Sequence, residues 1–412
     1  MIHIIGAGLA GLSAAVELAK AGHQVTLHEA GPAAGGRCRS YFDRELGCRI
    51  DNGNHLLLSG NRATLAYLAT IGAADTLTGP PTPLFPFIDL ATGERWTVAP
   101  NEGRLPWWIL SPTRTVRGAH LADWLALLRL RLARGDQTVG NVLATAGPLY
   151  ARLLEPLAIA ALNTMPDVAL ARLLGAVVDE TLAQGGAACR PLMPKQGMSE
   201  TFVDPALAWL AGRGATLHTG RRVAGLHVDA NRVQRLHTTE GPVDIRAGEA
   251  VVIATPPWVA TTLLPGLTAP DSFEAIVNVH FRAEADPRPA GFAGIVGGLA
   301  EWVFVKPGIV ATTTSAANRH ADLSADHLAT VAWEDVSTAL NLSGAIPPWR
   351  VVREKRATFA ATADQERRRP GPTTGLSNLA LAGDWTNTGL PATIEGAIRS
   401  GITAAQAVMR SR

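Results

Sequence analysis

Residues 2–29 read IHIIGAGLAGLSAAVELAKAGHQVTLHE, and this stretch decides the fold. An apolar strand runs into a glycine-rich turn, a helix follows, and a second strand ends at Glu29. The turn has the spacing GxGxxG, whose glycines allow a tight turn, close approach of a pyrophosphate and close helix packing. The carboxylate of Glu29 stands where it would accept both ribose hydroxyls. We therefore predict a dinucleotide site that includes Gly6, Ala7, Gly8, Leu9, Ala10, Gly11, Glu29 and Ala30. A glycine-rich core turn is the alternative.

The composition is that of a globular protein with large cores. The chain has 412 residues, of which 47% are hydrophobic and 17% charged, and this length is enough for two domains. No run of about twenty apolar residues occurs, and the chain opens with the strand itself, so we expect neither a spanning helix nor a signal peptide. The net charge of +2 argues against a nucleic-acid partner. Cys38, Cys48 and Cys189 form no CxxC pair, which indicates a reducing, cytoplasmic compartment and no metal site.

Two further glycine-containing segments follow Glu29. One is the tight cationic loop Gly35-Gly36-Arg37, and the other, at residues 51–58, reads DNGNHLLL. Together with Glu29 they resemble the flavoprotein superfamily of amine oxidases and phytoene-type carotenoid desaturases. In that superfamily the GGR loop lies against the FAD pyrophosphate. The resemblance therefore implies contacts with FAD at Gly35, Gly36, Arg37, Gly53, Asn54 and His55. For the two adjacent glycines, an ordinary turn is the alternative.

The C-terminal segment supplies the other half of the expected FAD site. Residues 379–397 read LALAGDWTNTGLPATIEGA, an apolar strand that delivers Gly383 and Asp384 and then a helix predicted to start at Pro391. The N-terminus of this helix is expected to face the flavin and to stabilise its reduced anion. Asp384 would accept a hydrogen bond from a ribityl hydroxyl or lie on the pyrophosphate side. Alternatively, Asp384 is an N-cap or turn residue. The implied contacts are Gly383, Asp384, Pro391, Ala392, Thr393 and Ile394. No cysteine lies here, where some amine oxidases attach the flavin, so we predict non-covalent FAD.

The resemblance implies an α/β fold in which a Rossmann-type FAD-binding domain carries an inserted α+β substrate domain. The FAD-binding domain is expected at residues 1–75, 195–265 and 371–412. The substrate domain is expected at 76–194, mainly helical, and at 266–370, a β-rich floor for the substrate cavity. Residues 215–254 predict five short strands in a meander, and the backbone near Val223 would meet the adenine side of FAD.

Longer strings narrow the resemblance to the squalene-associated FAD-dependent desaturases. These strings are residues 51–58, Asn163-Thr164-Met165-Pro166 and residues 383–397, and the likeness spans nearly the whole chain. The group more often has Gln at position 54. The activity that the resemblance implies is reductive loss of the allylic hydroxyl of hydroxysqualene, which gives squalene for hopanoid synthesis. Asp51 and His55 are the candidate proton donors. Alternatively, Asp51 caps the Gly53 turn, His55 contacts cofactor backbone, and water or the flavin supplies the proton.

Other functions stay open at this point: a carotenoid desaturase, a flavin amine oxidase or a non-catalytic FAD-binding protein. Amine oxidases use an aromatic cage, and none of the three tyrosines lies near the C-terminal motif, although Trp302 and Trp385 would substitute. Lys306 is a lysine of the predicted floor sheet.

An apolar isoprenoid substrate would reside in a bilayer, so we predict peripheral contact with the inner face of the cytoplasmic membrane. Residues 83–88 and 107–110 are the candidate contacts because tryptophan prefers the interface, with burial in the core as the alternative for both. The stretch at Gly6 is the single GxGxxG, so no second dinucleotide domain is visible. An external electron donor is therefore expected.

Overall fold

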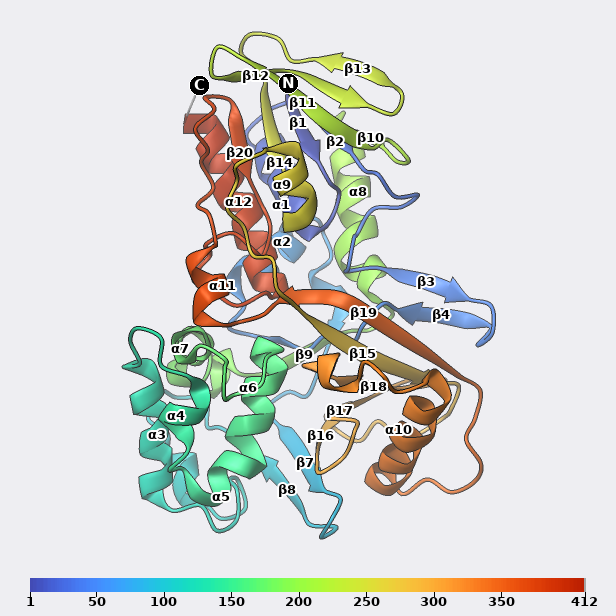
Figure 1. The fold of residues 1–412 in the computed structure, drawn as a ribbon. Helices are drawn as coiled ribbons and strands as arrows, with labels where there is room; N and C mark the ends of the chain where they lie inside the picture. Colours follow the sequence, from blue (N-terminus) through green and yellow to red (C-terminus); the bar gives the residue numbers. More distant parts are fainter. Residues whose placement is uncertain (411–412) are drawn as a thin grey trace.

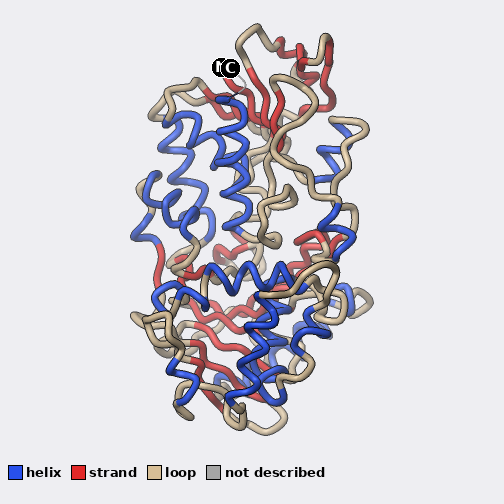
Figure 2. The backbone as a smooth tube through the Cα atoms, turned by 90° about the vertical axis from the view of Figure 1, so that its left-hand side faces the viewer, coloured by secondary structure: helices blue, strands red, loops and turns tan. Residues whose placement is uncertain are grey.

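The computed structural model describes residues 1–410 and has two lobes (Figure 1). The upper lobe in that view holds the first strand, the last helix and a parallel sheet, and the lower lobe holds a mainly antiparallel sheet with helices beside it. A quarter-turn shows the same division, with helices flanking strands in both lobes (Figure 2). The α/β class expected from the sequence is therefore present.

A five-stranded parallel sheet in the order β10-β2-β1-β14-β20 forms the upper lobe. Its strands come from three distant parts of the chain: β1 (Ile2–Ile5), β2 (Val25–His28), β10 (Thr216–His218), β14 (Ala250–Ile253) and β20 (Leu379–Leu381). The sequence prediction of one meander over 215–254 was wrong, because β10 and β14 join this parallel sheet. The antiparallel sheet that remains consists of β11 (Val223–Asp229), β12 (Arg232–Thr238) and β13 (Gly241–Asp244).

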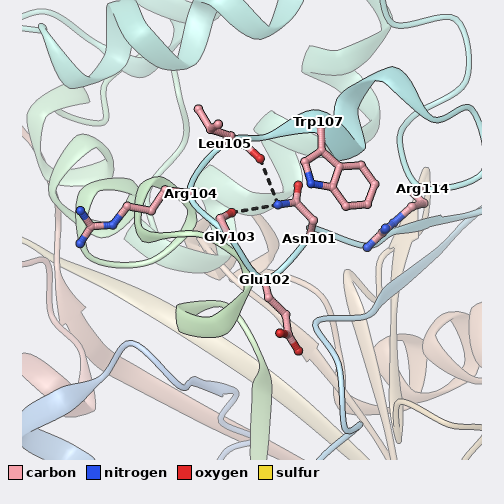
Figure 3. A pocket seen from close by; sticks show the side chains of 7 residues that line it. All are labelled: Asn101, Glu102, Gly103, Arg104, Leu105, Trp107 and Arg114. Atoms are coloured by element: carbon pink, nitrogen blue, oxygen red, sulfur yellow. Dashed lines mark hydrogen bonds between the residues drawn. The ribbon is translucent and has the colours of Figure 1, made fainter.

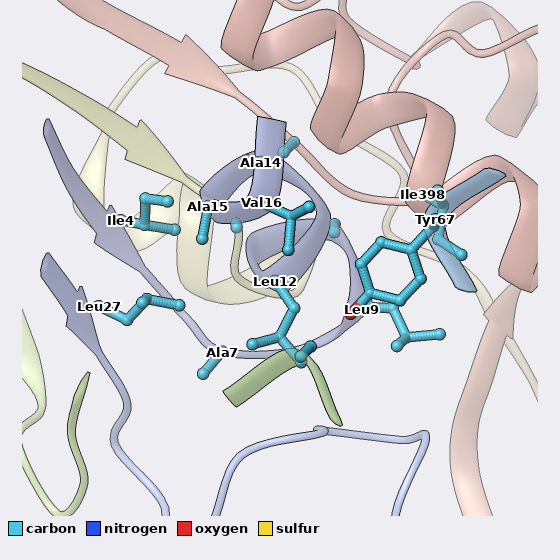
Figure 4. Close-up of a cluster of buried hydrophobic side chains, with 14 of the residues drawn as sticks. Ile4, Ala7, Leu9, Leu12, Ala14, Ala15, Val16, Leu27, Tyr67 and Ile398 are labelled. Carbon is cyan, nitrogen blue, oxygen red and sulfur yellow. The ribbon is translucent and has the colours of Figure 1, made fainter. Parts of the chain in front are cut away.

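Helix α1 (Leu9–Lys20) packs closely against helix α12 (Ile394–Arg410) because small residues line their contact. A Cβ at Gly401 would lie 2.3 Å from the Ala10 carbonyl oxygen, so no larger side chain fits there. Figure 4 shows Leu12 and Val16 of α1 among the buried apolar side chains of this lobe. The helix predicted to start at Pro391 instead begins at Ile394, where the Thr393 hydroxyl accepts the Gly396 N–H at 3.0 Å. Helices α2 (Arg62–Thr70) and α8 (Asp204–Ala211) complete the same core.

A seven-stranded sheet in the order β19-β15-β18-β17-β16-β7-β8 forms the lower lobe. Its strands are β7 (Phe85–Asp89), β8 (Arg95–Val98), β15 (Phe273–Phe281), β16 (Phe292–Val296), β17 (Trp302–Lys306), β18 (Ile309–Thr314) and β19 (Trp349–Phe359). Helix α10 (Ala325–Leu340) packs on one face through residues that include Trp333. In the first candidate membrane contact, residues 83–88, Phe87 and Ile88 of β7 are buried within the sheet, which favours the alternative of burial in the core.

Short helices line the other face of this sheet: α3 (Leu121–Arg131), α4 (Val139–Leu143), α5 (Gly147–Leu149), α6 (Glu155–Leu162) and α7 (Ala171–Glu180). Trp108 is buried here, and its ring meets the Trp124 ring edge to face at 4.8 Å. Its neighbour Trp107 is 56% exposed, so the second candidate membrane contact divides between core and surface. Within residues 1–410, no helix is both long and apolar enough to cross a bilayer.

A row of histidines crosses the upper sheet. His3 Nδ1 lies 3.2 Å from His28 Nε2, and the His28 ring stacks on that of His218 at 5.8 Å. Burial, reinforced by the neighbouring His3, lowers the pKa of His28 to about 3. His28 therefore stays neutral in the folded protein, while the unfolded chain takes up a proton near pH 6.5.

This burial makes stability depend on pH. Because the unfolded state binds more protons below pH 6.5, acidification favours unfolding. Between pH 6.5 and 5, we expect His28 to cost roughly 2 kcal/mol of the free energy of unfolding. Urea unfolding of His28→Leu should show a smaller loss over this range, whereas a change at the exposed His327 to Gln should leave the wild-type loss intact. Equal losses in wild type and His28→Leu would contradict the assignment.

Candidate functional site

A glycine cradle lies at the N-terminus of α1. A Cβ added at Gly11 would lie 2.0 Å from the Gly6 carbonyl oxygen, whereas a Cβ at Gly8 would meet no atom within 4 Å. The second glycine therefore faces open space while the third sits in a close internal contact. Gly8 is the N-cap of α1, and no side chain caps the helix there. Free N–H groups at such a helix end suit the oxygens of a phosphate.

The Gly35-Gly36 loop forms the opposite wall of the cradle. The Gly35 N–H donates to the Ala7 carbonyl at 2.8 Å, and a Cβ at Gly36 would lie 3.4 Å from the Gly8 Cα. Both glycines have positive φ, 106° and 59°, which glycine adopts at no steric cost. The GGR loop and the GxGxxG turn thus lie side by side.

Glu29 lies at the rim of this cradle, directly after β2. Its two carboxylate oxygens accept the Ala7 N–H at 2.8 Å and the Gly31 N–H at 2.7 Å. Each carboxylate oxygen has lone pairs beyond the one used here. Its contact with a ribose stays a prediction. Val223, the first residue of β11, is buried among apolar residues under the parallel sheet.

Arg37 and Asp384 join the two distant halves of the predicted cofactor site. The Arg37 Nη2 donates to both Asp384 oxygens at 2.7 Å, and its Nη1 donates to the Ala357 carbonyl. Asp384 is buried, and α12 begins ten residues later, so Asp384 does not cap that helix. Pro391 and Ala392 lie in the segment between Asp384 and the start of α12. Glu395, at the start of α12, accepts the Thr64 N–H at 2.8 Å and thereby fixes the helix end against α2.

Asp51 anchors a polar cluster where the upper lobe meets the lower sheet. Its carboxylate accepts Lys306 Nζ at 2.8 Å, Ser40 Oγ at 2.6 Å and the Met198 N–H at 2.8 Å. Burial opposes ionisation of Asp51, but the Lys306 ammonium and these hydrogen bonds hold its pKa below the ordinary value. Asp51 is therefore a carboxylate at neutral pH.

Two histidines flank this ion pair. Burial lowers the pKa of His55 to about 4, and it lowers the pKa of His280 to about 4 as well, in both cases against the attraction of the Asp51 charge. Both imidazoles are therefore neutral at pH 7. A neutral imidazole donates a hydrogen bond but holds no extra proton to release.

Asn54 connects the same turn to the sheet. Its Nδ2 donates to Thr313 Oγ1 at 3.2 Å, and Thr313 Oγ1 donates to Asn278 Oδ1 at 2.8 Å. The sequence analysis missed Asn278, Thr313 and His280. The signal that would have found two of them is the alternation in β15, where Asn278 and His280 share a face of the apolar run 275–281.

Aromatic rings continue this face of the sheet beyond the polar cluster. Trp302 and Phe304 alternate along β17 with Lys306, so all three side chains share one face. The Trp302 ring lies 5.5 Å from that of Phe87 and 6.1 Å from that of Phe292. The site thus places an ion pair at the edge of a buried cluster of aromatic side chains.

The geometry agrees with the comparison to known proteins. The model of the family described as "Flavin containing amine oxidoreductase" matches residues 9–285 and 304–409. The chain belongs to this family. Membership in the flavin containing amine oxidoreductase family confirms the expected superfamily and implies a flavin cofactor for an oxidoreductase.

Full-length relatives are also known. A hydroxysqualene dehydroxylase of Sinorhizobium fredii is 46% identical over 404 residues, which cover 98% of this chain and 97% of that protein. A hydroxysqualene dehydroxylase of Rhodopseudomonas palustris is 46% identical over 409 residues, 99% of this chain and 98% of that protein. Among solved structures, cyclohexylamine oxidase from Brevibacterium oxydans has a TM-score of 0.73 at 17% identity, covering 99% of this chain and 98% of that one. This last likeness shows the fold alone.

Proposed function

We propose that this protein is a hydroxysqualene dehydroxylase that removes the allylic hydroxyl of its substrate by reduction and yields squalene. The observation that carries the proposal is 46% identity to two proteins of that name over 98–99% of the chain. The ion pair of Asp51 and Lys306 beside the aromatic face of β17 supports it, because hydroxysqualene is a long hydrocarbon with one polar group.

We propose FAD, bound without a covalent link, as the flavin. The residues present fit it, since the Gly8 cradle is open, Glu29 lies at its rim, and the Arg37–Asp384 pair joins the GGR loop to the C-terminal segment. The remaining contacts proposed are those predicted from the sequence at Gly53, Asn54, His55, Val223 and residues 391–394. When bound and reduced by the external donor, the flavin would supply the hydride that replaces the hydroxyl.

The cofactor proposal predicts a yellow purified protein from which acid or heat releases the flavin. Chromatography of the released fraction should show FAD rather than FMN, because the cradle and Glu29 form a site for an ADP half. The three cysteines lie at 38, 48 and 189, none within the C-terminal segment that lines the site. Flavin that stays with the precipitated protein, or FMN in the supernatant, would contradict this assignment.

The chain must also supply a proton to the departing hydroxyl. The C–O bond breaks, a C–H bond forms, and the oxygen leaves as water after it takes one proton. Asp51 is ionised and His55 is neutral at pH 7, so we assign them positioning and hydrogen-bonding roles. We assign the proton to Lys306, whose ammonium group is held by Asp51. The rings of Trp302 and Phe304 would keep competing water away from the reacting carbon.

A single anaerobic turnover tests the reaction. Photoreduced enzyme is mixed with hydroxysqualene while the flavin spectrum is followed and the lipid is extracted. We expect reoxidation of the flavin with one squalene formed for each FAD. If oxidised enzyme instead desaturates an isoprenoid or oxidises an amine, while reduced enzyme ignores hydroxysqualene, a carotenoid desaturase or an amine oxidase takes the place of this proposal.

The proposed partners follow from the substrate and the cofactor. An external electron donor would reduce the flavin again, since the chain contains a single GxGxxG. An isoprenoid of this size resides in a bilayer, so we propose that a cytoplasmic protein meets the inner face of the membrane peripherally.

A further inference from the structure

Large apolar side chains are exposed over one short part of the chain. Of the twelve large hydrophobic residues exposed within residues 1–410, seven lie between positions 105 and 132. Three belong to the loop before α3: Leu105, Trp107 and Leu110. Four belong to α3 and its C-cap: Leu121, Leu125, Leu128 and Leu132. We call these seven residues the leucine face, and they lie in the helical part of the lower lobe (Figure 1).

The helix geometry places the four leucines of α3 in one stripe. At 100° per residue, the four leucines of α3 fall within about 60° of one another around the helix axis. Trp124 and Leu130 of the same helix are buried in the core that the short helices share with the sheet. Helix α3 is thus apolar toward the core and also apolar toward solvent. Packing of the core explains why Trp124 and Leu130 are apolar, but it does not explain the four leucines that face solvent.

Arginines surround this face. Residues 101–135 contain six arginines and two carboxylates, while the rest of the chain has 31 basic and 33 acidic residues. Arg129 and Arg131 lie on α3 roughly 80° to either side of the leucine stripe. Their guanidinium groups are held beside the stripe, where Arg129 Nη1 donates to Thr145 Oγ1 at 2.7 Å and Arg131 pairs with Asp179. Arg114 lies over the Trp107 ring, 5.0 Å from its centroid.

An open hollow of about 620 Å³ adjoins the leucine face at Trp107 (Figure 3). Its lining includes two guanidinium groups, those of Arg104 and Arg114, and the carboxylate of Glu102. The Asn101 amide donates to the carbonyls of Gly103 and Leu105 at 3.0 Å and thereby holds the loop that presents Leu105 and Trp107. The exposed side chains of the loop are therefore displayed by a hydrogen-bonded turn.

We propose that the leucine face docks on an anionic phospholipid bilayer, with α3 lying in the plane of the interface. Its arrangement is that of an interfacial helix, which combines leucine and tryptophan on one face with arginines beside them. The positive charge matches anionic lipid headgroups. A second copy of this chain fits less well, because a symmetric contact would bring the same six arginines together. The inference deepens the proposed function, on which it rests for the need to meet a bilayer.

Vesicle flotation tests the docking. Wild-type protein is mixed with vesicles of phosphatidylcholine and phosphatidylglycerol in equal parts, or of phosphatidylcholine alone. We expect binding to the anionic vesicles, and the double variant Leu125→Ser with Leu128→Ser should bind at least tenfold more weakly. The matched control is Phe42→Ser with Val228→Ser, which removes two exposed apolar side chains elsewhere and should bind like wild type.

A second pair of variants tests the charge. Arg129→Gln with Arg131→Gln should weaken binding to the anionic vesicles and lower its sensitivity to salt, since fewer charges meet the lipid. Melting temperatures of all variants confirm that each is folded. The proposal fails if wild type does not float, or if the leucine variant floats like wild type. It also fails if the leucine variant changes from dimer to monomer in the ultracentrifuge, which would assign the face to a second copy.

Turnover with detergent-dispersed hydroxysqualene separates this proposal from the proposed function. The leucine variant should keep the wild-type rate in detergent and lose at least tenfold of it when the substrate is presented in vesicles. No turnover by wild type in detergent would contradict the proposed reaction and leave the vesicle binding as measured.

Discussion

Replacing Gly8 with alanine is expected to weaken FAD binding roughly 5- to 150-fold without destabilising the flavin-free protein. Gly8 has φ −74° and ψ 179°, which alanine adopts without strain, and a Cβ there meets no protein atom within 4 Å. The methyl group would occupy only the open space at the end of α1. If the pyrophosphate passes through that space, overpacking costs the complex about 1–3 kcal/mol.

The measurement pairs Gly8→Ala with Gly11→Ala. Flavin fluorescence titration gives the affinity for FAD, and urea unfolding of the flavin-free protein gives the stability. Gly8→Ala should leave the free energy of unfolding unchanged or raise it by up to about 1 kcal/mol, because alanine restricts the unfolded chain. Gly11→Ala should destabilise the protein itself, since its Cβ would lie 2.0 Å from the Gly6 oxygen. Wild-type affinity in Gly8→Ala would contradict the placement of the pyrophosphate.

The parts of the fold that could be predicted are those with a local cause. The GxGxxG turn could be recognised because its glycines make close contacts a few residues apart. The apolar pattern around it predicts β1, α1 and β2. It was harder to predict which sheet each short strand joins. β10 and β14 are apolar runs among other short strands, and the sequence contains nothing that says which of them pair in parallel with strands some 200 residues away.

Predictions from local sequence also failed at two places. Pro391 is a good first residue for a helix, but the Thr393 hydroxyl and the Glu395 contacts with α2 set the start at Ile394. Trp107 and Trp108 are adjacent in sequence, and the tight turn that contains them directs one into the core and the other to solvent. Adjacent residues of such a turn point in different directions, so this one apolar segment contributes Trp108 to the core and Trp107 to the surface.

The candidate site shows the same limit. Glu29, the GGR loop and Asp384 are predicted cofactor contacts because the family motifs contain them, and these contacts stay a prediction. The partner of Asp51 could not, because Lys306 lies 255 residues away and no spacing connects them. The sequence therefore suggested Asp51 as a proton donor, while the fold gives it a neighbouring ammonium group that keeps it ionised.

Lys306→Met should lower the rate of squalene formation by ~10²- to 10⁴-fold, the range that general acid catalysis contributes. The proposed donor is lost, while the cradle at Gly8 and the Arg37–Asp384 pair stay intact, so the FAD content should not change. The rate is measured in the single anaerobic turnover, with Lys195→Met as the control. Lys195 donates to the Asp75 carbonyl at an exposed position and should be dispensable.

The change Lys306→Met also removes the counterion of Asp51, and a second variant tests this effect. Removal of Lys306 leaves the buried Asp51 carboxylate with two hydrogen bonds and no cation, a situation that raises its pKa and disturbs the site. The double variant Lys306→Met with Asp51→Asn removes both charges and restores neutrality. If the ammonium group is the proton donor, the double variant should be as slow as Lys306→Met. Recovery of the wild-type rate in the double variant would show that the unpaired carboxylate caused the loss, and Lys306 would then be a counterion to Asp51 with the proton coming from elsewhere.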